Sequence, residues 1–234
     1  MEMARVKYSV TPNMQIHEGL ATIYESGELA DFTVIVGDTQ FNVSKIILAA
    51  QSGYFHSMFL GKWKEATATN VTLVDEDPTA ISDMLKFLYT GVYKPTIPST
   101  PEAQIATTAL ATTTDSGDNT EANKAAIVAH MTQYIVGDKF FIPALRYASK
   151  KAFSSAVDKL RDHAVLLDLL EEVYASVPDL RTAAAKCMVR HLEPLLLDER
   201  FKKMMVEVDG LAVDICGAVL RYDTHARTSL SNAS

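Results

Sequence analysis

Residues 41–59, FNVSKIILAAQSGYFHSMF, constrain the fold of this chain more than any other segment, because their apolar period changes along the way. Phe41 and Val43 alternate as the residues of a strand do, and a helical period begins at Ser44. Serine is a residue type that caps helices, and Gly53 interrupts the helical pattern before it restarts. The segment therefore predicts a strand that leads into helix, with a break at Gly53.

An amphipathic helix is predicted first. It is followed by a β-hairpin whose second strand contains Phe41 and Val43. The helix carries four apolar residues at i, i+4, i+7 and i+8, which lie on one face. These residues are Ile16, Leu20, Ile23 and Tyr24. The hairpin covers residues 31–44, where apolar residues alternate on both sides of a turn at Gly37-Asp38.

A third short strand, NVTLV at 70–74, is followed by a second helix with clear boundaries. Asp77 is a good N-cap, Pro78 suits the first helical position, and Gly91 follows the end of the helix as a C-terminal cap does. The buried stripe of this helix is expected to be Ile81, Met84, Leu85 and Leu88. Residues 1–94 thus predict a small sheet with helices packed against it.

Residues 95–122 have a different composition, rich in Thr, Pro and Ala, with no Lys, Arg or aromatic residue. Because such a segment has little to bury, we predict a disordered insertion. Residues 123–234 predict only helices, interrupted at Pro143, with Asp179 as the N-cap of one of them. The predicted fold class is therefore α+β, with a small mixed sheet and an all-helical C-terminal region.

The composition argues against several classes of function. The net charge is −7 and there is no basic stripe, which nucleic-acid binding normally requires. The six histidines show no metal-ligand spacing, and the chain has no G-x-S-x-G, P-loop or G-x-G-x-x-G motif. We therefore expect no enzymatic activity, no cofactor or metal, and no small-molecule substrate.

No apolar run approaches the roughly 20 residues of a spanning helix, so no membrane association is expected. The first ten residues, MEMARVKYSV, contain no apolar segment of the kind found in secretory signals. The expected location is the cytoplasm, the nucleus or both.

Three parts of the chain resemble the BTB/POZ domain. They are residues 31–59, the strand at 70–74 with AISDMLKFLYTGVY at 80–93, and GDKFFIPALRYASKKAF at 137–153. The resemblance implies a BTB core at 1–94, interrupted by the insertion at 95–122, closing helices at 123–160 and a helical extension at 161–234. It also implies that the small residues Ala49, Ala50, Ser52 and Gly53 let two short helices turn sharply. The aromatics Tyr54, Phe55 and Phe59 then fill the space beneath the sheet. This layout is similar to that of BTB proteins of filamentous fungi.

In the BTB family, the helix before the first strand and nearby residues form a homodimer interface. The resemblance places that interface here at Ile16, Leu20, Ile23, Tyr24 and Asp31. The alternative, from the residues alone, is that the apolar stripe packs within its own chain.

Some family members also bind a cullin scaffold of ubiquitin ligases through a hydrophobic-x-Glu element. The matching residues in this chain are Trp63 and Glu65, in the sequence WKE. The alternative for these two residues is a loop aromatic that partly covers the core, beside a solvated carboxylate.

The resemblance implies a non-enzymatic interaction module that homodimerises, and it leaves two functions open. One is a substrate adaptor of a cullin-type ubiquitin ligase. The other is a dimerising scaffold in transcriptional regulation, without a link to a ligase. No kelch, MATH or zinc-finger segment is present to decide between them.

Overall fold

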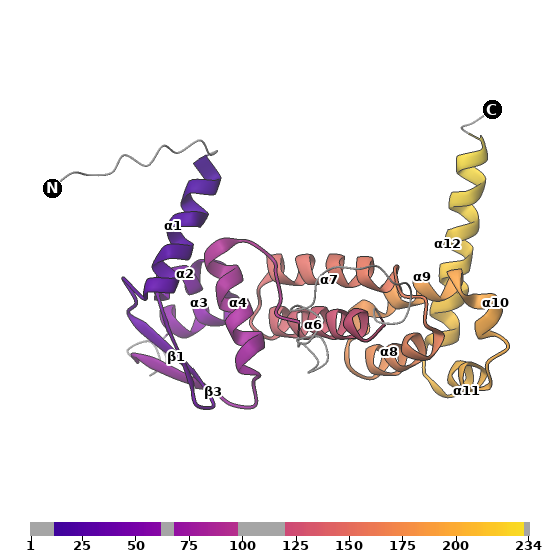
Figure 1. The fold of residues 1–234 in the computed structure, drawn as a ribbon, viewed down its shortest axis with the longest axis horizontal. Helices are drawn as coiled ribbons and strands as arrows, with labels where there is room; N and C mark the ends of the chain where they lie inside the picture. Colours follow the sequence, from indigo (N-terminus) through magenta and orange to yellow (C-terminus); the bar gives the residue numbers. More distant parts are fainter. Residues whose placement is uncertain (1–11, 62–67, 98–119, 232–234) are drawn as a thin grey trace, which may run out of the picture. The chain divides into compact units, whose positions relative to one another are not determined.

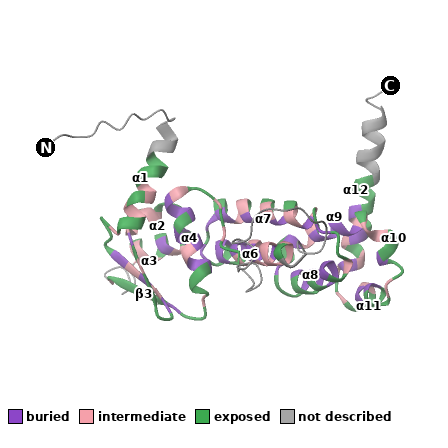
Figure 2. Cartoon of the chain, viewed as in Figure 1, coloured by how far each residue is buried: buried purple, intermediate pink, exposed green. Residues whose placement is uncertain are grey.

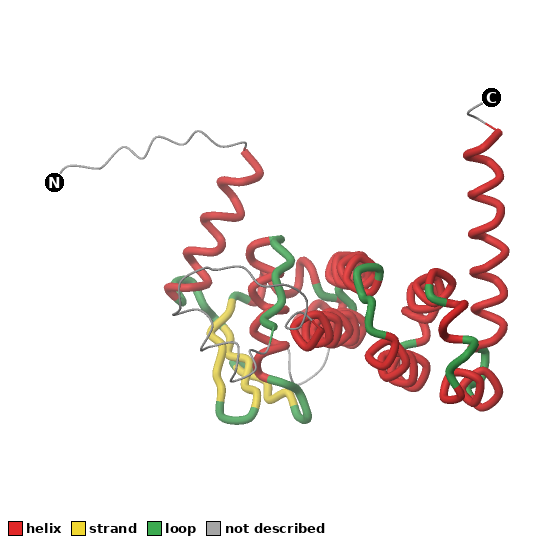
Figure 3. The backbone as a smooth tube through the Cα atoms, turned by 45° about the vertical axis from the view of Figure 1, so that its right-hand side comes forward, coloured by secondary structure: helices red, strands yellow, loops and turns green. Residues whose placement is uncertain are grey.

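The first strand of the predicted hairpin forms the centre of a three-stranded mixed sheet, and the second strand forms one edge (Figure 3). Strand β1 (Phe32–Val36) pairs antiparallel with β2 (Thr39–Val43) and parallel with β3 (Asn70–Leu73). Every second residue of β1 is buried, as the period of two predicts. Gly37, in the turn between β1 and β2, has a φ of 56°, a conformation that glycine adopts without strain. The predicted hairpin and third strand are confirmed.

The computed structural model describes residues 12–61, 68–97 and 120–231 (Figure 1). The chain divides into two compact units. The first contains residues 1–96 and 132–149, and the second contains 97–131 and 150–234. The two long helices α6 (Thr120–Lys139) and α7 (Pro143–Val157) each contribute residues to both units. The domain ranges inferred from the sequence remain predictions.

In the described part of the first unit, four helices accompany the sheet besides the shared α6 and α7. They are α1 (Pro12–Ser26), α2 (Lys45–Gln51), α3 (Gly53–Leu60) and α4 (Pro78–Thr90). The Asp77 side chain caps α4 by accepting a hydrogen bond from the Ala80 N–H at 2.8 Å, and Gly91 ends the helix with a φ of 66°. Both boundaries were predicted from the sequence and are confirmed. The buried stripe of α4 contains the expected residues, which are Ile81, Met84, Leu85 and Leu88.

The sharp turn between α2 and α3 is fixed by hydrogen bonds to a distant part of the chain. The buried Ser52 hydroxyl donates to the Phe140 carbonyl at 2.7 Å and accepts from the Phe55 N–H at 3.2 Å. The Gly53 N–H donates to the Phe141 carbonyl at 3.0 Å. A Cβ at Gly53 would lie 3.0 Å from the Cβ of Phe141, so the absence of a side chain permits this close approach.

Aromatic rings fill the space beside this turn. The ring of Phe55 is fully buried and stacks with those of Phe59 and Phe140, with centroid distances of 5.8 Å to each. The Tyr54 ring meets the Phe140 ring edge-on at 5.1 Å. The expected packing of Tyr54, Phe55 and Phe59 is therefore confirmed, and Phe140 completes the cluster from a position 81 or more residues further along the chain.

Helices alone make up the described part of the second unit. After the shared helices, these are α8 (His163–Ser176), η2 (Pro178–Leu180), α9 (Arg181–Arg190), α10 (Leu192–Leu195), α11 (Glu199–Glu207) and α12 (Leu211–Ser231). Helix α8 has a buried apolar face (Figure 2). Cys187 and Met188 on α9 are also buried. The all-helical C-terminal region is confirmed.

Two predicted details of these helices are wrong. Asp179 does not cap α9, because it lies in the turn η2 and Leu180 occupies the N-cap position without a side-chain hydrogen bond. The α6 helix begins at Thr120, inside the range predicted as insertion, so the helix starts earlier than its apolar pattern indicated.

Candidate interaction surface

Helix α1 packs on α4 and leaves one residue of its predicted apolar stripe exposed. Leu20, Ile23 and Tyr24 are partly buried against the core of the first unit. Ile16, one turn before Leu20, is 60% exposed. Three of the four stripe residues thus pack at least partly within their own chain, which agrees with the alternative that the residues alone suggested. Ile16 is the member that remains available to a partner.

Tyr24 joins α1 to the core through Tyr89 of α4. Their ring centroids are 4.8 Å apart with an interplanar angle of 40°. Burial raises the pKa of both hydroxyls, and the Tyr24 side chain also hydrogen-bonds to Ser82. Both tyrosines therefore stay neutral over the physiological pH range and act as rigid, partly polar packing groups.

Asp31 holds the beginning of α2. Its carboxylate accepts a hydrogen bond from the backbone N–H of Lys45 at 2.7 Å. Ser44 occupies the N-cap position, yet its side chain makes no capping hydrogen bond. The expected capping role of Ser44 is therefore wrong, and Asp31 satisfies an orphan donor of the first turn from outside the helix. The negative charge also favours the N-terminal end of the helix dipole.

The predicted dimer residues Tyr24 and Asp31 are thus connected through the start of α2. Tyr24 stacks on Tyr89, whose hydroxyl accepts from the Ser44 N–H, and the next residue, Lys45, donates to Asp31. The importance of Tyr89 was missed in the sequence. In the sequence, Tyr89 stands out only as a residue with a hydroxyl in an otherwise apolar stripe. That feature does not show which group the hydroxyl bonds to.

Trp63 and Glu65 lie outside the described residues, so their predicted contact stays a prediction. The structure does describe Ala68, the first residue after this segment. The Lys45 ammonium donates to the Ala68 carbonyl at 2.7 Å and lies 5.2 and 5.4 Å from the ring centroids of Phe32 and Phe59. Lys45 therefore anchors the segment that follows residues 62–67.

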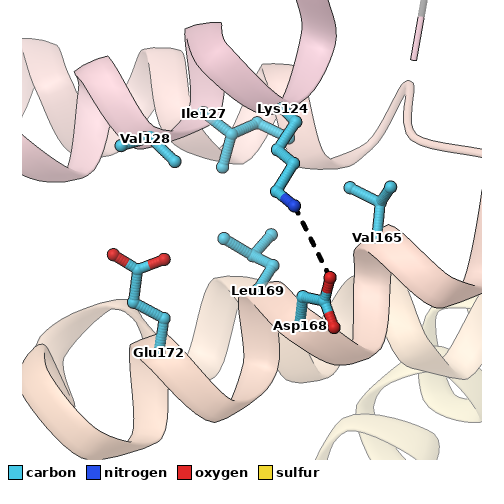
Figure 4. Close-up of a pocket in the computed structure, with 7 residues that line it drawn as sticks. All are labelled: Lys124, Ile127, Val128, Val165, Asp168, Leu169 and Glu172. Carbon is cyan, nitrogen blue, oxygen red and sulfur yellow. Dashed lines mark ion pairs between the residues drawn. The ribbon is translucent and has the colours of Figure 1, made fainter. Parts of the chain in front are cut away.

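A small cavity lies between α6 and α8 within the second unit (Figure 4). Its volume is about 20 Å³, close to that needed for one water molecule. The Lys124 ammonium lies 3.5 Å from the Asp168 carboxylate at its rim, and Arg200 contacts the same carboxylate at 2.8 Å. The hydrogen bond from Arg200 holds the pKa of Asp168 below its usual range. This site is a structural ion-pair cluster and is too small for an organic ligand.

Within residues 12–61, 68–97 and 120–231, no three His, Cys, Asp or Glu side chains gather in a way that could hold a metal ion. Among the helices of that same part of the chain, none is long and apolar enough to span a membrane.

Comparison with known proteins identifies the first unit. A family model of the BTB/POZ domain matches residues 20–112. The chain contains a BTB/POZ domain. The α+β fold expected from the sequence resemblance is thereby confirmed, with its small mixed sheet, its α2–α3 turn and its helical C-terminal region.

Several proteins share the BTB domain. The chain is 47% identical over 60 residues to BTB and MATH domain-containing protein 15 of Caenorhabditis elegans, covering 26% of this chain and 22% of that protein. It is 38% identical over 74 residues to mouse Kelch-like protein 30, covering 32% and 13% of the two chains. It is 32% identical over 94 residues to human Kelch-like protein 17, covering 38% and 15%. The matches thus span about a fifth or less of these relatives.

A solved structure, the BTB domain of zebrafish PATZ1, aligns with a TM-score of 0.43 and 16% identity, covering 64% of this chain and 98% of that one. The family match ends at residue 112, before α6 and α7. The assignment of residues 123–160 as closing helices of the BTB domain therefore stays a prediction. BTB domains are generally interaction modules, which gives the surface around α1 its significance.

Proposed function

We propose that this protein is a non-enzymatic interaction module that homodimerises through α1 of its BTB domain and acts as a substrate adaptor of a cullin-type ubiquitin ligase. The observation that supports self-association is the exposure of Ile16 on a helix whose neighbouring stripe residues are already packed. The similarity to Kelch-like proteins, of which the matches cover 13% and 15%, supports the adaptor role.

Each exposed apolar side chain is expected to contribute modestly to the free energy of dimerisation. Fully burying an isoleucine is worth roughly 1.5–3 kcal/mol, and a symmetric dimer buries each contributing residue twice. Asp31, the other residue assigned to the dimer interface, has a fixed carboxylate, since its hydrogen bond to Lys45 leaves little freedom of orientation. Leu20, Ile23 and Tyr24 support the helix that presents Ile16.

Self-association is tested by light scattering on the wild type and on Ile16→Asp at protein concentrations in the tens of micromolar. We expect a dimer for the wild type and a monomer for the variant. Ile46→Asp is the matched control, because Ile46 is 74% exposed on α2 of the same unit. A monomeric wild type, or an Ile46→Asp variant that dissociates as fully as Ile16→Asp, would contradict the proposed interface.

The ligase role is tested by measuring the affinity of the chain for a cullin N-terminal domain, with Trp63→Ala and Glu65→Ala variants. Truncation of a tryptophan anchor typically costs at least about 2 kcal/mol, or roughly thirtyfold in affinity. We expect lost binding with an unchanged melting temperature. If the wild type does not bind under conditions where a known BTB adaptor does, the adaptor role is excluded and the dimerising scaffold remains.

A further inference from the structure

The second unit contains a groove between α9 and α12 that plays no part in the function proposed above. The two helices contact each other, as Figure 1 shows for their ribbons. The groove has a volume of about 230 Å³. Each helix contributes residues at i, i+3 and i+4, which share one face. The lining residues are Lys186, Val189 and Arg190 from α9, and Ala218, Arg221 and Tyr222 from α12.

The lining divides into an apolar floor and a cationic rim. Ala218 is 3% exposed and Val189 is partly buried, so these two residues form the enclosed part of the groove. Lys186, Arg190 and Arg221 are exposed. Three cationic side chains around one groove are notable in a chain with a net charge of −7. The groove therefore offers attraction for anionic groups above a floor that favours an apolar one.

The rim cations differ in how strongly they are engaged within the protein. Arg190 forms an ion pair with Asp158 at 2.9 Å, which neutralises part of its charge. Lys186 forms no ion pair with any side chain in the described part of the chain. The Tyr222 ring, 62% exposed, adds an aromatic surface beside the cations. Lys186 is thus the cation best placed to pair with an incoming carboxylate.

We infer that this groove binds an acidic peptide segment of a partner protein. One apolar side chain of the segment packs on Val189 and Ala218, and a flanking carboxylate pairs with Lys186. The volume lies below the roughly 300–1,000 Å³ of typical small-molecule sites, and it suits a single large side chain. A groove between two helices is also a common way to receive an amphipathic segment.

Nucleic acid fits the groove less well than an acidic peptide. Binding to phosphates normally draws on an extended set of cations, whereas this rim has three, and Arg190 is paired with Asp158. The apolar floor, moreover, has no counterpart in the backbone of a nucleic acid. The groove lies within the second unit, so its binding does not depend on self-association through α1.

The test is fluorescence polarisation with the full chain and a labelled 12-residue peptide that has one central leucine flanked by glutamates. We expect saturable binding that Lys186→Glu weakens by roughly tenfold or more. Lys203→Glu is the matched control, because Lys203 is exposed on α11 and lies outside the groove. We expect that variant, and Ile16→Asp, to bind within about twofold of the wild type, and all variants to keep their melting temperature.

Two further peptides and an oligonucleotide complete the test. Replacing the leucine by alanine should weaken binding about fivefold through lost apolar burial, and replacing the glutamates by glutamines should weaken it at least as much. Three results would overturn the inference. They are a lack of saturable peptide binding, equal binding of the leucine and alanine peptides, and a 12-nucleotide single strand that binds as tightly and loses affinity with Lys186→Glu.

Discussion

The Tyr89 hydroxyl accepts a hydrogen bond from the backbone N–H of Ser44 at 2.7 Å, and this bond joins α4 to the start of α2. Tyr89 is 2% exposed, so its hydroxyl has almost no access to solvent. The Ser44 N–H lies just before the first turn of α2, where backbone donors have no partner within the helix. A side chain from α4 therefore supplies the acceptor for a backbone donor at the start of α2.

Tyr89→Phe is expected to lower the free energy of unfolding by about 1–3 kcal/mol, because it leaves a partly buried N–H without an acceptor while preserving the ring. The measurement is urea unfolding of the purified chain. Tyr147→Phe is the matched control, since Tyr147 is 72% exposed and its change should cost less than about 0.5 kcal/mol. Equal effects of the two substitutions would contradict the role assigned to Tyr89.

Asp31→Ala is expected to destabilise the protein by about 1 kcal/mol through loss of the external cap of α2. Ser44→Ala should cost clearly less, because the Ser44 side chain makes no capping hydrogen bond. The order of the two melting temperatures is the measurement. A larger loss for Ser44→Ala would restore the capping role that the sequence suggested for it.

Gly53→Ala is expected to destabilise the first unit by about 1–3 kcal/mol, because the added Cβ lies 3.0 Å from the Cβ of Phe141. Phe141 has little room to retreat, since its carbonyl accepts the Gly53 N–H. Gly19→Ala is the control: Gly19 lies in α1 and a Cβ there meets no atom within 4 Å. That substitution should be neutral or stabilising by up to about 1 kcal/mol. A lower melting temperature for Gly53→Ala, with an unchanged or higher one for Gly19→Ala, would confirm both expectations.

Acidification is expected to destabilise the protein through His191 and His130. Burial lowers the pKa of both side chains, and His163, Arg161 and Arg190 lower that of His191 further. The His191 Nε2 atom is buried without a hydrogen-bond partner, and the His163 ring lies 5.3 Å away. Arg190, one of these cations, also forms an ion pair with Asp158 at 2.9 Å.

The direction follows from proton binding. Both histidines have their ordinary pKa of about 6.5 in the unfolded chain and a lower one in the folded chain. Stability is therefore full above pH 6.5 and falls as the pH drops from 6.5 toward the folded pKa values, because the unfolded chain binds more protons there. Melting temperatures between pH 7.5 and 5.5 measure this loss, and His191→Gln should reduce it. His56→Gln, at an exposed position on α3, should leave it unchanged.

Local patterns were enough to predict the elements that bury one face. The alternation of Phe32, Val34 and Val36 predicted β1, and the Asp77-Pro78 pair predicted the start of α4. The sequence did not identify the contacts that hold α2, because Ser44 receives its acceptor from Tyr89 and Lys45 from Asp31. Such bonds join residues with no common period, so no local rule signals them.

The same limit applied to the candidate interaction sites. The period of α1 placed Ile16, Leu20, Ile23 and Tyr24 on one face, but it could not show that only Ile16 would be left exposed. The α9–α12 groove arises from two i, i+3, i+4 sets that are separated by more than twenty residues. Each set alone is typical of an ordinary helix, and only the packing of α9 on α12 brings their cations together.

The hydrogen bonds of Ser52 and Gly53 to Phe140 and Phe141 have a consequence for the order of synthesis. The sheet and the first four helices are complete in sequence by residue 96, yet the unit that they form also needs residues 132–149. The nascent chain cannot satisfy the buried Ser52 hydroxyl until Phe140 has left the ribosome. A fragment cut after the last BTB-matched residue, 112, would lack Phe140 and expose the ring of Phe55, which makes it a poor substitute for the whole chain.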